Sequence, residues 1–117
     1  TINTTVVISR EELEVCLNRA GIISREHFYN NVVLNFGENN LNILAESEKG
    51  KVNENIDCNV EGEPVKIGIN NKYIYEAVSK IKEDYVKIEI ENNVRPIIVR
   101  KTDGDDFRCI ILPVRIV

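Results

Sequence analysis

The order of secondary-structure signals in this 117-residue chain repeats once, and this repeat restricts the fold more than any other feature of the sequence. Each half shows one strand, one helix and then three strands at hairpin spacing, and the turn 61–64 joins the two halves. Repetition of one unit favours a single architecture built from two similar parts. The sequence therefore predicts an α+β fold in which a duplicated strand-helix-strand-strand-strand unit places two helices on one face of antiparallel sheets.

A capping box marks the first helix. Ser9 and Glu12 have the S-x-x-E spacing, and Ile8 and Leu13 stand where a hydrophobic staple would close. The pattern predicts a helix that starts at Ser9 and ends at Gly21 in a left-handed conformation. Its buried stripe comprises Leu13, Cys16, Leu17 and Ala20.

The second helix follows the alternating strand 65–69. Asn70 is a favourable N-cap residue, and Ile69 and Ile74 have the staple spacing. The expected buried residues of this helix are Ile74, Ala77, Val78 and Ile81, and the expected solvated ones are Lys72, Glu76, Ser79 and Lys80.

Strand signals follow each helix. In the first half they cover residues 31–36, 41–46 and 51–60, and in the second half 85–91, 94–101 and 107–112. Val86, Ile88 and Ile90 alternate with charged residues and are expected to point inward. Asn92 and Asn93 predict a two-residue turn.

Composition excludes several classes of protein. The net charge of −4 lacks the basic footprint of proteins that bind nucleic acid by neutralising phosphates, so any DNA contact is expected to be loose or local. No apolar run is long enough to cross a bilayer, so no membrane role is expected. The chain starts at Thr1 and contains no Met, which predicts a fragment or a processed product, and its three cysteines predict a cytoplasmic protein with reduced thiols.

Residues suited to catalysis are few. His27 is the only histidine, Cys16 lies on the buried stripe of the first helix, and Cys58 and Cys109 fall in strand signals without zinc-site spacing. The acidic turn 103–106 lacks the downstream glutamate of a calcium loop. The sequence therefore predicts no catalytic residue, no metal site and no cofactor. An alternative is a small enzyme that uses Cys58 or Cys109 with His27, which requires a lowered thiol pKa.

The C-terminal run 109–117 is almost wholly apolar around Pro113 and Arg115. Together with the duplicated unit and the spacing of Asn70 and Tyr73, this run resembles the third domain of the bacterial sliding clamp family, the β subunit of DNA polymerase III. The resemblance covers nearly the whole chain. It implies that residues 1–117 are a single domain from a longer chain of three similar domains.

The resemblance also implies a function. Members of this family are homodimers that close head to tail into a ring around duplex DNA, with helices lining the inner wall. The ring is a non-catalytic processivity factor of DNA replication. Its expected partners are the DNA polymerase III α subunit, the clamp loader and other proteins that carry a clamp-binding motif, a short segment with glutamine and a Leu-Phe-like ending.

The resemblance assigns residues to three surfaces. The implied peptide-binding residues are Phe28, Asn70, Tyr73, Val94, Pro96, Ile110, Leu112, Pro113, Val114, Arg115 and Ile116. The implied dimer interface contains Ile22, Ile23 and the strand edge 45–52, and the residues expected to face DNA are Arg19, Lys72, Lys80 and Lys82.

Alternatives remain for several of these residues. Taken alone, Val94 and Ile110 fit a core position better, and the four basic residues fit ordinary solvated helix charges equally well. Val117 follows the residue that commonly ends the family chain, so it alters or extends the rim of the pocket. An adaptor or structural domain with the same duplicated fold, but without ring or pocket, is the second alternative to a clamp.

Overall fold

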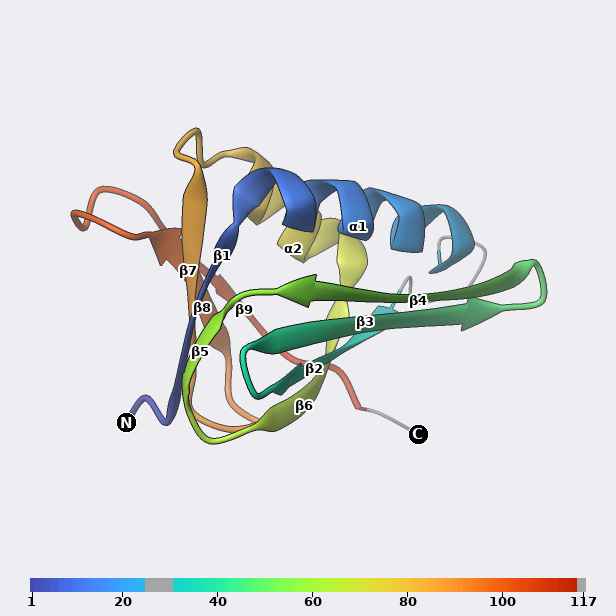
Figure 1. The fold of residues 1–117 in the computed structure, drawn as a ribbon, viewed down its shortest axis with the longest axis horizontal. Helices are drawn as coiled ribbons and strands as arrows, with labels where there is room; N and C mark the ends of the chain where they lie inside the picture. Colours follow the sequence, from blue (N-terminus) through green and yellow to red (C-terminus); the bar gives the residue numbers. More distant parts are fainter. Residues whose placement is uncertain (25–30, 116–117) are drawn as a thin grey trace.

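The computed structural model describes residues 1–24 and 31–115, which form two helices and nine strands (Figure 1). The first half contains β1 (Thr4–Ser9), α1 (Arg10–Ser24), β2 (Asn31–Gly37), β3 (Asn40–Ser47) and β4 (Gly50–Asp57). After β5 (Asn59–Gly62), the second half contains β6 (Val65–Asn70), α2 (Asn71–Ser79), β7 (Tyr85–Ile90), β8 (Ile97–Lys101) and β9 (Arg108–Ile111). The predicted α+β class and the duplicated order of elements are confirmed.

The two halves exchange their first strands. One sheet has the order β5-β1-β7-β8-β9, so it joins β1 of the first half to three strands of the second. The other sheet has the order β4-β3-β2-β6, so it joins β6 of the second half to three strands of the first. All these pairings are antiparallel, with Val6 opposite Ile88 and Val32 opposite Ile69. Neither half therefore completes its own sheet.

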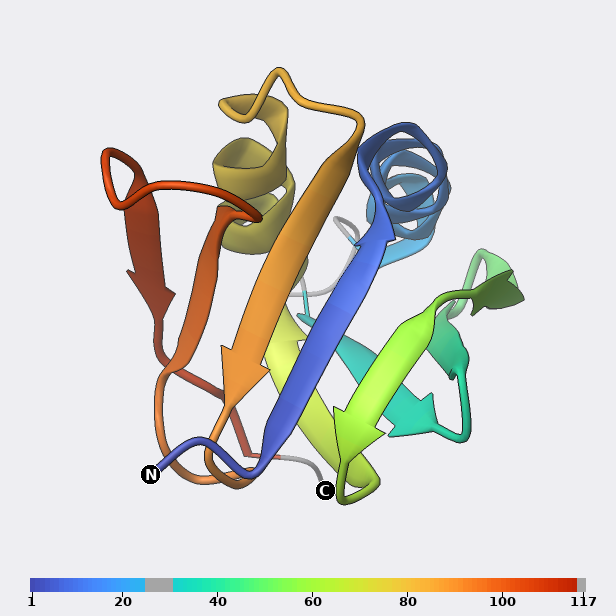
Figure 2. The ribbon, with the colours of Figure 1, turned by 60° about the vertical axis from the view of Figure 1, so that its left-hand side comes forward.

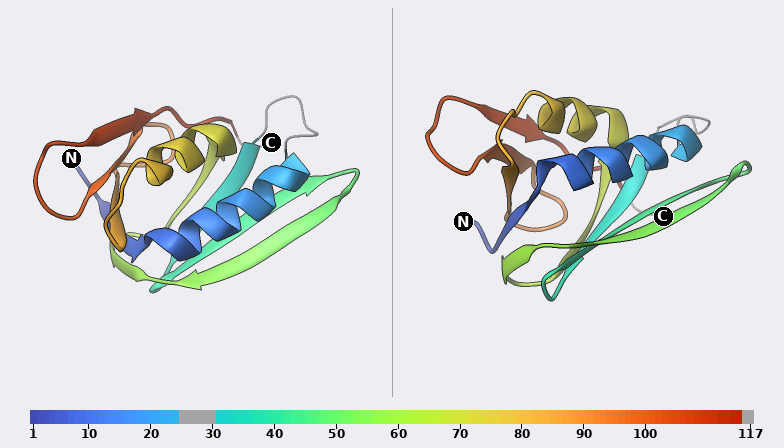
Figure 3. Two further views of the ribbon diagram at one scale, coloured as in Figure 1. Left: turned by 90° about the horizontal axis from the view of Figure 1, so that it is seen from above. Right: turned by 45° about the horizontal axis from the view of Figure 1, so that its top comes forward.

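Both helices cover the same side of the sheets and pack against each other (Figures 1 and 3). Helix α1 also lies along β3 and β4, and one core of buried residues runs through both halves. The predicted buried stripes of both helices lie in that core, including Leu13, Leu17, Ile74 and Ile81. Since a single core joins the sheets and helices, the chain behaves as one packing unit.

The first helix ends later than the sequence predicts. Ser9 Oγ accepts a hydrogen bond from Glu12 N at 3.3 Å, so the predicted cap forms. The prediction that Gly21 ends the helix is wrong, because α1 continues to Ser24. Gly21 is not among the residues with positive φ; instead, a Cβ atom there would meet the Asn71 side chain at 2.8 Å. The missing side chain of Gly21 thus allows α1 and α2 to pack closely, and it does not serve a left-handed turn.

Two strand predictions are corrected by the structure. The expected single strand 51–60 is divided at Cys58 into β4 and β5, which belong to different sheets, as Figure 2 shows in green. The expected strand 94–101 begins only at Ile97, because Asn92 Oδ1 accepts from Val94 N at 2.9 Å and from Arg95 N at 3.0 Å. A side-chain turn of this kind replaces the predicted two-residue hairpin turn with the longer link 91–96.

Candidate functional site

The apolar C-terminal segment returns to the sheet that contains β6. Val114 N donates to Gly68 O at 2.9 Å, and the two residues form an isolated antiparallel bridge. Because β6 is an edge strand whose last residue is Asn70, this bridge brings the segment 112–115 to the strand that leads directly into α2. Pairing also covers part of an edge that would otherwise be free to pair with another chain.

A shallow pocket of about 330 Å³ opens beside this segment. It is lined by Asn93, Val94, Pro113, Val114 and Arg115. Aliphatic and proline surfaces form its walls, and one amide and one guanidinium provide polar groups at its margin. Such a combination suits a small apolar anchor whose backbone is held by hydrogen bonds.

The start of α2 presents two further candidate residues. Asn70 Oδ1 accepts from Lys72 N at 2.9 Å and from Tyr73 N at 3.3 Å, as expected of an N-cap. Tyr73 is 56% exposed, although its ring is large and apolar. An exposed aromatic ring held on a capped first turn is a well-ordered contact for a ligand.

The exposure of the predicted peptide-binding residues differs from one to the next. Val94 and Ile110 are 75% and 65% exposed, so the prediction that they fit a core position is wrong. Ile110 lies beside the buried Ile111 in β9 and must point to the opposite face. Leu112 is 70% exposed, and Pro96 is half-buried. Phe28 and Ile116 lie outside the described residues.

The pocket lining itself contains four of the predicted residues, Val94, Pro113, Val114 and Arg115. Asn70, Tyr73, Pro96, Ile110 and Leu112 are not part of it. Asn93 lines the pocket but was expected only in a turn, and its position next to Val94 was the one signal that pointed to it.

Among the residues expected to face DNA, Arg19 has a partner within the chain. Its Nε and one terminal nitrogen donate to the two carboxylate oxygens of Glu54 at 2.8 and 2.6 Å. These bonds from Arg19 hold the pKa of the Glu54 carboxyl below its usual range, although burial acts in the opposite direction. A phosphate group would have to compete with this carboxylate for Arg19.

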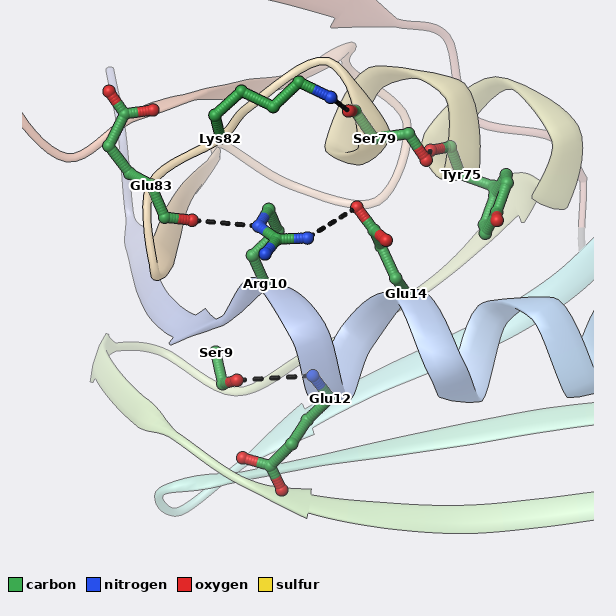
Figure 4. A network of polar contacts seen from close by, with 8 residues as sticks. All are labelled: Ser9, Arg10, Glu12, Glu14, Tyr75, Ser79, Lys82 and Glu83. Atoms are coloured by element: carbon green, nitrogen blue, oxygen red, sulfur yellow. Dashed lines mark hydrogen bonds and ion pairs between the residues drawn. The ribbon is translucent and has the colours of Figure 1, made fainter.

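The other basic candidates lie on or next to α2. Lys72 and Lys80 are exposed, and neither forms an ion pair within the described ranges 1–24 and 31–115. Lys82 Nζ donates to Ser79 O at 3.2 Å, at the end of the helix (Figure 4). A cation at that end is favoured by the helix dipole, so Lys82 also has a structural role.

Arg10, the first residue of α1, forms bonds within its own helix and to the loop after α2. Its Nε donates to Glu83 O at 3.0 Å and a terminal nitrogen binds Glu14 at 3.0 Å, as Figure 4 shows. Its backbone N–H donates to Asp84 O at 2.9 Å. The start of α1 is therefore joined to the loop that follows α2.

The residues expected at the dimer interface lie at the far end of α1. Ile22 is 53% exposed, whereas Ile23 is half-buried and packs against the core. Strand β4 is the outer strand of its sheet, so one side of its backbone is unpaired within that sheet. An exposed aliphatic side chain near an open strand edge is suited to contact with another protein surface.

The environment of Cys58 does not favour a reactive thiolate. All three are free thiols. Burial, and then the charge of Asp57, raises the pKa of Cys58 to about 11, which is opposite to the lowered thiol pKa that the enzyme alternative requires. That alternative is therefore wrong for Cys58, and His27 lies outside the described residues.

The described residues contain neither a metal-ligand cluster nor an apolar helix of membrane length. In residues 1–24 and 31–115, no three His, Cys, Asp or Glu side chains lie close enough together to hold a metal ion. Neither helix in these ranges has both the length and the apolar character to cross a membrane.

The interlocked halves, with both helices on one side of two antiparallel sheets, define a duplicated α+β domain. Comparison with known sequences then specifies the family: residues 1–115 match the family described as "DNA polymerase III beta subunit, C-terminal domain". The chain belongs to this family.

Known relatives agree with this assignment. The chain is 31% identical over 107 residues to a beta sliding clamp of Vibrio cholerae, and 33% identical over 110 residues to one of Staphylococcus aureus. These alignments cover 91% and 92% of this chain but only 29% of each relative. The chain thus spans less than a third of the length of the relatives that it matches.

Solved structures show the same fold. The DNA polymerase III beta subunit of Thermotoga maritima superposes with a TM-score of 0.95 at 25% identity, covering 100% of this chain and 32% of that one. The sliding clamp of Bacillus subtilis gives a TM-score of 0.94 at 27% identity, with 100% and 32% coverage.

Proposed function

We propose that the chain is the third domain of a ring-shaped sliding clamp, a non-catalytic processivity factor of DNA replication in the cytoplasm. The observation that carries this proposal is the pocket beside the docked C-terminal segment, in a chain that belongs to the beta subunit family. Two such subunits, each with two further domains, would close head to tail around duplex DNA.

Encirclement would allow a protein with a net negative charge to stay on DNA. A closed ring leaves the duplex only by opening or by reaching a free end, so it needs no tight hold on phosphates. The net charge of −4 and the pairing of Arg19 with Glu54 both suit weak, sliding contact. In this proposal Lys72, Lys80 and Lys82 lie on the inner wall, with Arg19 as a partly neutralised fourth residue.

The pocket would bind the clamp-binding motif of the DNA polymerase III α subunit, the clamp loader and other partners. The apolar walls bury the aliphatic and aromatic end of the motif, at about 25 cal/mol per Å² of apolar surface removed from water. Asn93, Arg115 and the capped start of α2 provide polar groups that orient its backbone. Phe28, Pro96, Ile110, Leu112 and Ile116 would complete the rim.

The dimer interface would form at the C-terminal end of α1 and along the outer edge of β4. Ile22 would pack on the first domain of the neighbouring subunit. Ile23, which packs against the core, would hold this end of α1 in place. The edge of β4 near Val52 would pair with a strand of that domain.

Peptide binding tests the proposal with a matched pair of tyrosines. Tyr73 and Tyr85 are 56% and 55% exposed, so their replacement by alanine should affect folding to a similar, small extent. Calorimetry with a synthetic peptide that contains Gln and ends in Leu-Phe should show weaker binding for Tyr73→Ala, by about 10-fold or more. Tyr85→Ala should bind like the wild type.

The same experiment separates the clamp from an adaptor domain of the same fold. An adaptor without a pocket predicts equal behaviour of the two variants and of a scrambled peptide. Equal affinities of Tyr73→Ala, Tyr85→Ala and wild type, with the scrambled peptide binding equally well, would therefore contradict a peptide site that extends from the pocket to Tyr73.

A further inference from the structure

Asn71, the first residue of α2, is a polar side chain in an apolar position. It is 4% exposed, whereas the other buried residues of α2 are Ile74, Ala77 and Val78. Its Nδ2 atom donates to Leu17 O of α1 at 2.9 Å, and its Oδ1 atom has no hydrogen-bond partner among the described residues. An unpaired buried acceptor lowers stability, which an aliphatic side chain of similar size would avoid. Packing stability alone therefore does not account for an amide at this position.

Gly21 is the complement of Asn71 on α1. A Cβ atom at residue 21 would lie 2.8 Å from Asn71 Nδ2, closer than real Cβ atoms approach their neighbours. In an α-helix the carbonyl of residue 17 faces the N–H of residue 21, so the amide reaches α1 at a turn where no side chain is in the way. Leu17, Gly21 and Asn71 form what we term the helix joint.

The helix joint lies between two exposed regions. Ile22, which directly follows Gly21 in α1, is 53% exposed. On the other side, Asn70 precedes Asn71, and its side chain accepts from the backbone N–H of Tyr73 at 3.3 Å. Figure 3 shows the two helices side by side. Among the described residues, the helix joint connects the last turns of α1, which carry Ile22, with the first turn of α2, which carries Tyr73.

We propose that Asn71 is a positioning residue that, together with Gly21, makes the last turn of α1 move with the first turn of α2. A ligand that displaces Tyr73 also displaces Asn71, and the bond to Leu17 O passes the displacement to the turn that bears Ile22. A hydrogen bond has preferred length and direction, so it resists sliding that apolar contacts permit. This inference rests on the proposed peptide site for its natural ligand, and it connects that site to the proposed subunit contact.

A double substitution removes the bond without leaving a hole. Asn71→Val with Gly21→Ala replaces the amide by a shorter aliphatic side chain and places a methyl group in the space released. Asn71→Ala alone removes the bond with no added bulk, and it serves if the double variant does not fold. Glu76→Ala is the control, because Glu76 is an exposed residue of the same helix.

Amide NMR of the wild-type chain and these variants, titrated with the Gln-containing, Leu-Phe-ending peptide, tests the coupling. In the wild type and in Glu76→Ala, shifts at Tyr73 should be accompanied by shifts at Gly21 to Ser24. In the double variant, the shifts at Tyr73 should persist and those at Gly21 to Ser24 should fall by about threefold or more. Undiminished shifts at Gly21 to Ser24 in the double variant, or none in the wild type when Tyr73 responds, would overturn the proposal.

A second arm does not need the peptide. If the wild type shows no peptide-induced shift at Tyr73, the proposed peptide site fails, and Tyr73→Ala becomes the perturbation instead. Its effect on the amides of Gly21 to Ser24 should be about threefold larger with Asn71 present than in the double variant. Equal effects in both backgrounds would overturn the helix joint independently of the peptide site.

Discussion

Side-chain caps decide where the two helices begin. Ser9 and Asn70 both occupy N-cap positions, and the spacing of their neighbours was enough to predict them from the sequence. Gly21 was not predictable in the same way. A glycine near the end of a helical pattern usually ends it, and only the position of Asn71 on the other helix shows why this one does not.

The Asn70 cap predicts a measurable loss of stability. Asn70→Ala removes the acceptor of the Lys72 and Tyr73 N–H groups and should lower the free energy of unfolding by about 1 kcal/mol. Asn70→Ser keeps a capping oxygen and should lie close to the wild type. Urea denaturation of the three proteins checks this, and an unchanged midpoint for Asn70→Ala would show that the cap is dispensable.

The thiol of Cys58 predicts a pH-dependent reactivity. Because burial and Asp57 raise its pKa to about 11, the thiol should stay protonated at neutral pH and react slowly with iodoacetamide in the folded protein. The rate should rise as the pH approaches 11 and should increase on unfolding at any lower pH. Mass spectrometry of labelled peptides measures it, and rapid labelling of Cys58 at pH 7 would contradict the environment described.

At the scale of elements, periodicity predicted most strands and failed at their ends. The division at Cys58 was not visible in the sequence, because the residues on both sides alternate like one strand and only the pairing partners change. Val94 was included in a strand because its residue type favours one, but the Asn92 side chain holds it in a turn. Taken alone, without the resemblance that assigned it to the peptide site, Ile110 was expected in the core, because alternation does not identify which face of an edge strand meets the core.

Gly62, the last residue of β5, and Gly37 should respond differently to substitution by alanine. Gly62 has φ of 104° and a Cβ there would lie 1.9 Å from Asn3 O, whereas a Cβ at Gly37 would meet nothing within 4 Å. Gly62→Ala should therefore lower the free energy of unfolding by more than about 1 kcal/mol, and Gly37→Ala by much less. Thermal denaturation compares the two variants. Equal losses of stability would mean that the backbone next to Asn3 tolerates a side chain at residue 62.

At the scale of the whole molecule, the exchange of β1 and β6 makes the two halves one fold. The repeat predicted the elements and their buried faces. It did not predict which sheet β1 and β6 join, because the same buried face suits either sheet. The pocket was likewise predicted only in part. The resemblance named Val94, Pro113, Val114 and Arg115, which line it, whereas the place of Asn93 in the lining was seen only in the structure.

Encirclement of DNA is the central claim at this scale, and retention on DNA tests it most directly. The full-length protein that contains this domain should be loaded by its clamp loader onto a nicked circular plasmid and then separated by gel filtration in high salt. The proposal predicts that it stays with circular DNA and is released when a restriction enzyme linearises the plasmid, because a ring slides off a free end. Equal retention on circular and linear DNA, or release from both by salt alone, would show that phosphate contacts rather than a closed ring hold the protein, and would contradict the account.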